Sequence, residues 1–478
     1  MKKKWLALLL ALIFAIALLA GCNSASENSP SNTGSNSGSP GSPSGGSGAS
    51  VEKGYQKDMQ KDTIEIYAVR PVTGDSALFQ QTAFGPQYKM WEDEINKDGG
   101  LYVKSLDRKV QVHITTIDDT SDMEKTRQLL EQVLANNKPD LILAPEGTAR
   151  LFAAAPIAQK YGYLMIAAEG GAKDLAKEFE NMRNYGETVG VFSVLSYSET
   201  QVPALVKLFE ELGVKSVYCA YINDLHGIEY WNYTEEILKG IGIEIKGSEP
   251  VDPAAPNGDV IINNAMSSGA DAFLGYMYPP QAIPVTMTAR ALNYVPKMYL
   301  LGPGLCYDFF SVFAFDDFSQ DSLHGIMGWG GWNEKSSDRA KAYSEHFRSY
   351  WIEKGMFWKN ADGSPNFDAI VSDAAVFQDW WGHICYYSVM QVLQQAVENA
   401  GELDSNGILK QSTLIDYVAN NTFDTVMHPA LKFTDNILLD DMYLGNVGQW
   451  QNRVFEVIDN DSRRTADPIF PFPGWWQG

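Results

Sequence analysis

Residues 63–69 read TIEIYAV and residues 109–117 read KVQVHITTI. Both runs are rich in β-branched and aromatic residues, which predicts two β-strands. The segment between them carries apolar residues at successive spacings of four, three and four, as on one side of a helix, and Gly99-Gly100 then ends that helix. The apolar positions are Phe84, Tyr88, Trp91 and Ile95. This order of strand, helix and strand predicts a βαβ unit with parallel strands.

The same alternation continues along the chain. Apolar stripes at helical spacing, such as 129–134 and 202–209, separate further short β-rich runs. Because open sheets of nine strands tend to divide, we predict an α/β fold of two doubly wound parallel-sheet lobes, split near Gly190. The further predicted strands are 141–143, 164–167, 188–192, 216–221, 244–248, 272–276 and 297–301.

Composition excludes several classes of protein. The 478 residues include 37 Lys and Arg against 59 Asp and Glu, a formal net charge of −22. Because a chain this acidic would repel a polyanion, we predict no nucleic-acid partner. With four Cys in the whole chain, a disulfide-stapled scaffold is excluded.

The N-terminus has the pattern of an export signal. Lys2, Lys3 and Lys4 precede an apolar stretch at 5–20, which is shorter than the roughly 20 residues of a membrane-spanning helix. The stretch ends in LAGC (19–22), which resembles the lipobox of bacterial lipoproteins. We therefore predict a lipoprotein signal peptide at 1–21 and lipidation of Cys22; the alternative is an ordinary secretory signal that happens to contain Cys.

A low-complexity segment follows the signal. Of the 28 residues at 23–50, 24 are Ser, Gly, Asn or Pro, a composition that cannot bury enough apolar surface to fold. We predict a disordered tether at 22–62 that holds an acidic body at the membrane. Loss of the three signal lysines would take the net charge from −22 to −25. An acidic body is repelled by an anionic membrane, so it should stand free of the lipid.

Ligands of open α/β sheets bind beyond the carboxyl ends of the strands. The loops at these ends contain neither the glycine spacing of a dinucleotide or phosphate site nor the motifs of zinc proteases and serine hydrolases. The six His are scattered, and the cluster Asp118, Asp119 and Asp122 reads better as a solvated turn before a helix than as a calcium loop. We predict no cofactor and no metal. The loops are 70–77, 144–149, 168–172, 222–227, 277–281 and 302–307.

A series of short motifs resembles one family, the type I periplasmic binding proteins, in the branch of the leucine and branched-chain amino acid binding proteins of ABC importers. The resemblance runs from 63 to 473. The motifs are PVTGD (71–75), DEIN (93–96) with DGG (98–100), DDTSD (118–122), AP (144–145) with AAAPIA (153–158), GYMYP (275–279), LGP (301–303) and QWQ (449–451).

The resemblance implies a fold of two lobes joined by three crossovers, near Gly190, Ile326 and Tyr443. Lobe 1 is then 63–190 plus 327–442, and lobe 2 is 191–326 plus 443–478. The glycines of GWGGW (328–332) lie at a crossover, where they could act as a hinge.

The resemblance also implies a binding site. Glu146, Gly147 and Thr148 stand where the family holds a ligand carboxylate, and the next such loop holds Glu169, Gly170 and Gly171, without the family's hydroxyl. Gly304 replaces an acidic residue that pairs with a ligand ammonium. Four further positions complete the predicted ligand-binding set: Phe79, His226, Tyr276 and Tyr278.

Glu146 and Glu169 are the main departures from the family pattern. A ligand carboxylate between them would meet like charge. Either both side chains point to water, or the ligand is not an ordinary amino acid; facing the cleft, they would suit a cationic or hydroxyl-rich ligand.

These observations predict a monomeric, lipid-anchored solute-binding protein on the extracytoplasmic face of the cell membrane, in the periplasm or at the cell surface. It would capture an amino acid or related polar molecule and deliver it to an ABC permease. The alternatives are an accessory receptor that presents a ligand to a membrane sensor and a hydrolase using Glu146 with Glu169. Cys219, Cys306 and Cys385 allow at most one disulfide.

Overall fold

The computed structural model describes most of the chain from residue 56 onward. The described residues are 56–170, 173–184, 186, 188–195, 198–302, 320–354, 381–438, 447–452, 454–459 and 462–476. The predicted signal peptide, Cys22, Gly171, Gly304 and Cys306 lie outside these ranges. Within them, no helix combines the length and apolar character needed to cross a bilayer.

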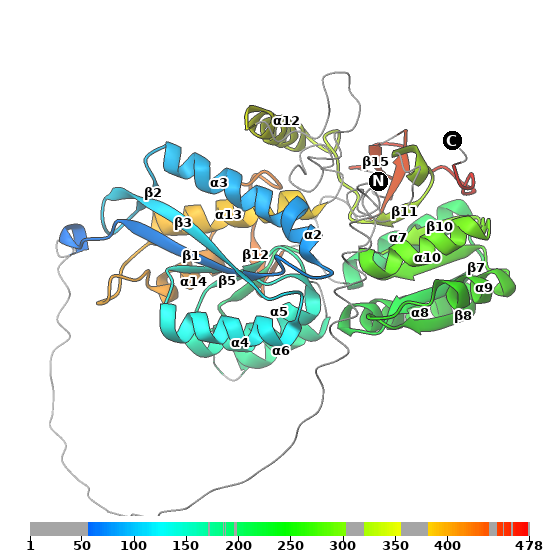
Figure 1. Cartoon of the computed structure of the whole chain (residues 1–478), viewed down its shortest axis with the longest axis horizontal. Coiled ribbons are helices and arrows are strands. Elements are labelled where there is room, and N and C mark those ends of the chain that lie inside the picture. The colour runs from blue at the N-terminus through cyan, green and yellow to red at the C-terminus, as the bar shows by residue number, and fades with distance from the viewer. Residues whose placement is uncertain are drawn as a thin grey trace, which may run out of the picture. The chain divides into compact units, whose positions relative to one another are not determined.

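Two four-stranded sheets with their covering helices form what we call the first lobe (Figure 1). In one sheet, of order β2-β3-β1-β4, β1 pairs in parallel with β3 and β4, and β2 is antiparallel to β3. In the other, of order β12-β13-β6-β5, β6 is parallel to β5 and β13. The strands are β1 (Thr63–Arg70), β2 (Leu101–Val103), β3 (Arg108–Asp118), β4 (Leu141–Leu143), β5 (Met165–Ala167), β6 (Val191–Ser193), β12 (Phe433–Thr434) and β13 (Ile437–Leu438).

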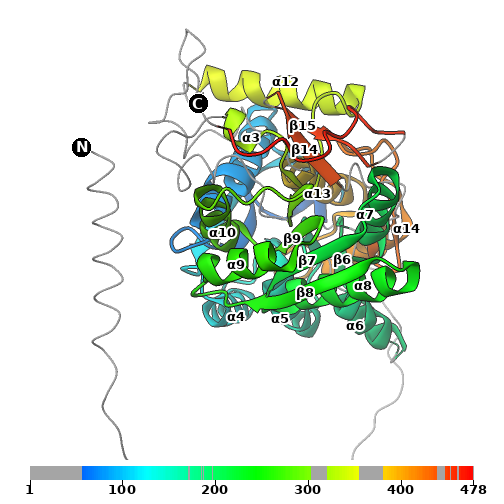
Figure 2. The same cartoon turned by 90° about the vertical axis from the view of Figure 1, so that its right-hand side faces the viewer.

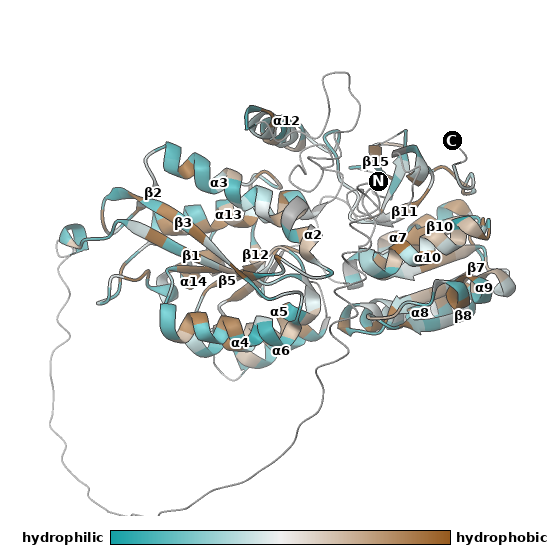
Figure 3. Cartoon of the chain, viewed as in Figure 1, coloured by the Kyte–Doolittle hydropathy of each residue, from teal (hydrophilic) through white to brown (hydrophobic). Residues whose placement is uncertain are grey.

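Helices cover both faces of these sheets because the strand residues are apolar on both sides. Along β1, Ile64 and Ile66 pack with α3 and α13, whereas Val69 packs with α4, α5 and α6. Figure 3 shows apolar residues along the strands and mixed faces on the helices. The helices are η1 (Gln56–Asp58), α2 (Ala77–Phe79), η2 (Gln80–Phe84), α3 (Gly85–Lys97), α4 (Met123–Gln132), η3 (Val133–Asn137), α5 (Gly147–Tyr161), α6 (Lys173–Asn184), α12 (Asp338–Glu353), α13 (Trp381–Ala400) and α14 (Gln411–Asn420).

A seven-stranded sheet of order β15-β14-β11-β10-β9-β7-β8 and its helices form the second lobe. Its faces alternate in the same way: Val217 and Cys219 of β7 pack with α7 and α8, whereas Tyr218 and Ala220 pack with α9 and α10. Figure 2 shows these four helices around β7. The elements are α7 (Ser198–Leu212), β7 (Ser216–Ile222), α8 (Leu225–Ile241), β8 (Glu244–Val251), α9 (Gly258–Ser268), β9 (Ala272–Tyr276), α10 (Pro279–Ala291), β10 (Met298–Leu301), η4 (Gln320–Leu323), β11 (Met327–Trp329), β14 (Val447–Gln451) and β15 (Val454–Val457).

The chain crosses three times between the sheets of the two lobes, between β6 and β7, between β11 and β12, and between β13 and β14. The predicted α/β class with three crossovers is therefore confirmed. Two strands lie on the other side of the predicted boundaries, since β6 pairs with β5 and β11 pairs with β10. Gly190 does not mark the boundary: a Cβ there would lie 2.8 Å from Ile415 and from the Tyr163 carbonyl, so close packing requires this glycine.

The tether prediction is wrong at its C-terminal end. Residues 56–62 are bound to the first lobe, because Gln56 donates to the Leu403 carbonyl at 3.0 Å and Lys61 donates to the Gly407 carbonyl at 2.8 Å. Lys61 also forms an ion pair with Asp140 at 2.9 Å. These partners are remote in sequence, so composition alone could not reveal the contact.

The acidic cluster after β3 builds the start of a helix. Asp122 is the N-cap of α4 and accepts from the Lys125 amide at 2.9 Å. Asp119 is fully buried and accepts from the Ser121 amide and the Thr126 hydroxyl, so this part of the turn is not solvated as predicted. Cys219 and Cys385 are buried free thiols.

Candidate functional site

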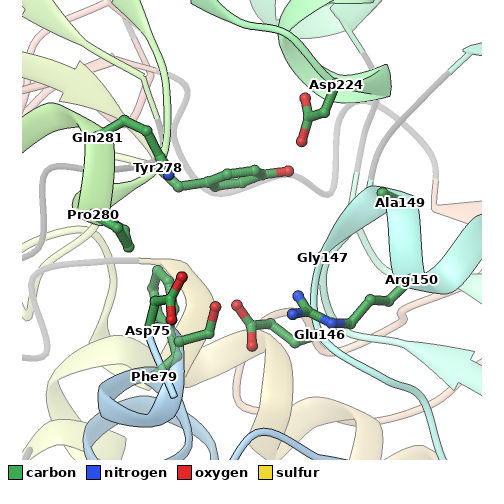
Figure 4. Close-up of a pocket in the computed structure, with 11 residues that line it drawn as sticks. Asp75, Phe79, Glu146, Gly147, Ala149, Arg150, Asp224, Tyr278, Pro280 and Gln281 are labelled. Carbon is green, nitrogen blue, oxygen red and sulfur yellow. The ribbon is translucent and has the colours of Figure 1, made fainter. Parts of the chain in front are cut away.

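A cavity of about 100 Å³ lies at the carboxyl ends of strands from both lobes (Figure 4). This is the place where open parallel sheets bind ligands, because the loops and helix N-termini converge there. The residues that line it follow β1 and β4 in the first lobe and β7 and β9 in the second. They are Asp75, Ser76, Phe79, Glu146, Gly147, Ala149, Arg150, Asp224, Tyr278, Pro280 and Gln281.

Glu146 is the carboxylate most deeply held in this lining. It takes the N-cap position of α5 in extended conformation, and its side chain makes no capping hydrogen bond. The residue is 6% exposed, and its Oε2 has no hydrogen-bond partner in the described part of the chain. Burial raises the pKa of Glu146 from 4.5 to about 8; Arg150 opposes the rise and Glu169 adds to it.

Glu169 lies directly behind Glu146, after β5. Its Oε1 accepts a hydrogen bond of 3.0 Å from the Gly147 amide, one of the free donors at the start of α5. Burial raises the pKa of Glu169, and the nearby Arg70 opposes the rise. The two carboxylates that the sequence singled out are thus both buried and adjacent to the cavity.

Arg70 supplies the buried cation of this region. It is 0% exposed, donates to the Ala144 carbonyl at 2.6 Å, and stacks its guanidinium 3.9 Å from the centre of the Phe84 ring. The ring of Tyr386 lies 5.1 Å away. These contacts hold a positive charge beneath Glu169, although the sequence places Arg70 more than 90 residues from it.

Aromatic rings form the wall on the second lobe. Tyr278 is the N-cap residue of α10, and its ring stacks on His226 with centroids 5.3 Å apart. His226 also contacts Tyr230 at 4.4 Å. Burial lowers the pKa of His226 to about 3, so the imidazole is neutral at pH 7 and acts as part of an aromatic wall.

Two further charged side chains line the cavity, Asp224 and Arg150. Asp224 is the N-cap of α8 and accepts from the Gly227 amide at 2.9 Å, and burial raises its pKa. Arg150 donates to the Ser121 carbonyl at 2.7 Å and lies 4.0 Å from the buried Asp119. Its guanidinium is therefore engaged within the first lobe.

The structure separates the predicted site residues into three groups. Phe79, Glu146, Gly147 and Tyr278 line the cavity. Glu169 and His226 contact lining residues from behind, whereas Thr148, Gly170 and Tyr276 are buried without lining it. Gly171 lies outside the described residues.

The prediction of Tyr276 as a lining residue is wrong. This side chain points into the second-lobe core, where its hydroxyl lies 3.0 Å from that of Thr234. Alternation along β9 aims Tyr276 at α8, whereas Tyr278 lies beyond the strand end. Gly170 has φ +98°, and a Cβ there would lie 2.8 Å from Leu151. That glycine serves packing.

Sequence reasoning did not name the remaining lining residues. All but Arg150 fall within the predicted strand-end loops, so the sequence predicted their segments but not the individual residues. Arg150 lies one turn inside α5, just beyond the predicted loop at 144–149. The unnamed lining residues are Asp75, Ser76, Ala149, Arg150, Asp224, Pro280 and Gln281.

Several solved structures share this fold. Leucine-binding protein LivK from Thermotoga maritima has a TM-score of 0.63 and 16% identity, covering 83% of this chain and 99% of that chain. LivJ from Streptococcus pneumoniae, solved with isoleucine, has a TM-score of 0.64 and 16% identity, covering 86% and 100%. A solute-binding protein from Rhodopseudomonas palustris, solved with 3,4-dihydroxybenzoic acid, has a TM-score of 0.63 and 13% identity, covering 86% and 99%.

Comparison with curated proteins finds no match. The sequence model of the family described as periplasmic binding protein matches residues 63–451, from the first residue of β1 to the last residue of β14. That match spans most of the chain and agrees with the fold of the solved structures. The chain therefore belongs to the periplasmic binding protein family, as its motifs predicted.

Proposed function

We propose that this protein is a lipid-anchored solute-binding protein outside the cytoplasm, which captures a small polar molecule between its lobes and delivers it to an ABC importer. The observation that carries the proposal is the cavity lined by strand-end loops of both lobes. A ligand that contacts both lobes favours the closed state by its differential affinity. Membership of a family of ligand-binding proteins supports the same role.

A binding screen tests the capture step. The mature chain with Cys22→Ser, which removes the lipidation site, would be heated with amino acids, amides, polyamines, sugars and aromatic acids. A compound at 100 times its Kd should add about 2.7 kcal/mol to the free energy of unfolding. Stoichiometric binding without turnover supports a binding protein, whereas chemical conversion of a bound compound would point to the hydrolase alternative.

Delivery and anchoring need separate tests in cells. Deleting the protein should abolish uptake of the identified ligand, and the wild-type chain should restore it. The Cys22→Ser variant should leave the membrane fraction, because without the acyl chains nothing in the predicted tether holds the protein to lipid. Uptake that survives the deletion would contradict the transport role and favour the sensor alternative.

A further inference from the structure

We infer that the ligand carries an ammonium or guanidinium group, which binds in the first lobe against Glu146. This inference rests on the proposed function and names the chemical class of its ligand. Three independent features of the cavity support it: an unpartnered buried carboxylate, an excess of acidic side chains, and an anion position that the protein itself fills.

The first feature is the state of Glu146. Buried polar atoms nearly always have a hydrogen-bond partner, and leaving one without a partner costs about 1–3 kcal/mol. Glu146 Oε2 has no such partner in the described ranges, and the carboxylate borders the open space of the cavity (Figure 4). Once ionised, this carboxylate only accepts hydrogen bonds, so the partner that stabilises its ionised form is an N–H or O–H donor, and a cationic donor makes the stronger bond.

The second feature is charge. Among the described residues that line the cavity, three are carboxylates and one is a guanidinium. Arg150 offsets part of the charge of Glu146, but it also donates to Ser121 and lies beside the buried Asp119, so the carboxylates of the lining outnumber its one cation. The ring of Tyr278 borders the same space, and aromatic faces attract cations.

The third feature is the anion position at the start of α5, where the family resemblance predicted that a ligand carboxylate would bind. A helix N-terminus binds anions through its free amides. At the start of α5 the Gly147 amide already donates to Glu169 Oε1, so a side chain of the protein occupies that position. The carboxylate of Glu169 thus takes the place of a ligand carboxylate, and Glu146 adds like charge at that position when it is ionised.

Matched compounds test the class of ligand. The probes are n-butylammonium, putrescine, agmatine and guanidinium as cations, n-butanol as the neutral analogue, and n-butyrate as the carboxylate analogue. We expect the cations to give the largest increases in Tm of the mature Cys22→Ser chain. Larger increases with butyrate than with the cations would overturn the inference and leave the proposed function intact, whereas no binding in any arm would count against both.

Three variants test the residues, with binding measured by calorimetry for the best cation and for butyrate. Glu146→Gln should weaken the cation at least tenfold, because it removes the charge and keeps the size. Glu169→Gln should remove the negative charge beside the Gly147 amide and so improve butyrate binding. Glu180→Gln, an exposed carboxylate on α6, is the matched control and should change neither affinity.

The unliganded variants are first checked by thermal unfolding. If a buried variant fails to fold, Asp75→Asn replaces it, since Asp75 is exposed and lines the cavity. That change should weaken the cation several-fold and leave n-butanol unaffected. Equal cation affinity in the wild type, Glu146→Gln and Asp75→Asn would overturn the inference.

Discussion

Glu146 is the residue on which the inferred cation binding rests. Charged or titratable groups face it from its own helix, from the loops beside it and from across the cavity. Burial among them raises its pKa to about 8, so the unliganded carboxyl is largely protonated at neutral pH. The groups are Arg150, Glu169, Arg70, Asp119, Asp75, Asp224 and Tyr278.

This pKa predicts opposite pH dependences for the two kinds of ligand. A cation pairs with ionised Glu146, so its affinity should rise as the pH increases from 6 to 9, and binding at pH 7 should release a proton. An anion is repelled by ionised Glu146, so its affinity should fall over the same range. Calorimetry in buffers of different ionisation enthalpy measures both effects. Glu146→Gln should remove most of the slope.

Gly227, next to His226, shows how one residue positions this wall. A Cβ at Gly227 would lie 2.1 Å from the Ile222 carbonyl oxygen, because the start of α8 packs on the end of β7. We predict that Gly227→Ala lowers the free energy of unfolding by about 1–3 kcal/mol.

Gly240 of the same helix is the control, because nothing lies within 4 Å of its Cβ position. Gly240→Ala should raise the free energy of unfolding by about 0.5–1 kcal/mol. Denaturant unfolding of both variants gives the comparison. Equal effects would mean that close packing does not require Gly227.

At the scale of elements, α12 carries the chain back to the first lobe after β11. Tyr343, Phe347 and Trp351 are buried on one side of it. Polar contacts add to this packing: His346 lies 2.5 Å from Glu94 of α3, and Tyr350 donates to Asp93 at 2.6 Å. The helix is thus bound to α3 by both kinds of contact.

The contact of His346 predicts a pH-dependent docking of α12. The hydrogen bond to Glu94 raises the pKa of His346 above 6.5. Its stabilisation is therefore fully present below pH 6.5 and is lost as the pH rises through the folded-state pKa. Both side chains are partly exposed, so the effect should stay below about 1 kcal/mol.

Denaturant unfolding at pH 6 and pH 8 measures this effect. His346→Gln should remove the part of the difference in free energy of unfolding between pH 6 and pH 8 that comes from the imidazole. Tyr350→Phe should lower stability by a similar amount at both values of pH, because its bond to Asp93 does not depend on the imidazole. A His346→Gln variant with the wild-type pH dependence would contradict the assignment.

At the scale of the whole molecule, the cavity takes residues from both lobes, so ligand binding and lobe closure should be coupled. We predict that a saturating ligand lowers the radius of gyration in small-angle X-ray scattering. Tyr278→Ala removes a second-lobe contact and should both weaken binding and reduce this compaction. Tight binding with no change in the scattering curve would contradict closure.

The two neighbouring glycines of the predicted hinge GWGGW, Gly330 and Gly331, differ in what an alanine would test. Gly330 has φ +83°, which favours glycine, whereas a Cβ at Gly331 would lie 2.8 Å from Gly448. Gly331→Ala therefore tests packing against β14, and Gly330 is the position that bears on the hinge.

The sequence by itself determined the α/β class, the strands β1 and β3 to β10, the loops that line the cavity, and the family. Local patterns suffice for these because an apolar stripe or a β-rich run reflects the burial of neighbouring residues in the chain. It also identified Glu146 and Glu169 as departures from the family pattern.

Only the tertiary structure decided what those departures mean. That Glu169 fills the start of α5, that Arg70 lies beneath it, that Tyr276 faces the core, and that residues 56–62 bind the first lobe all depend on contacts between distant segments. Burial and charge at the cavity arise from residues of different strands, and no local pattern encodes the distance between them.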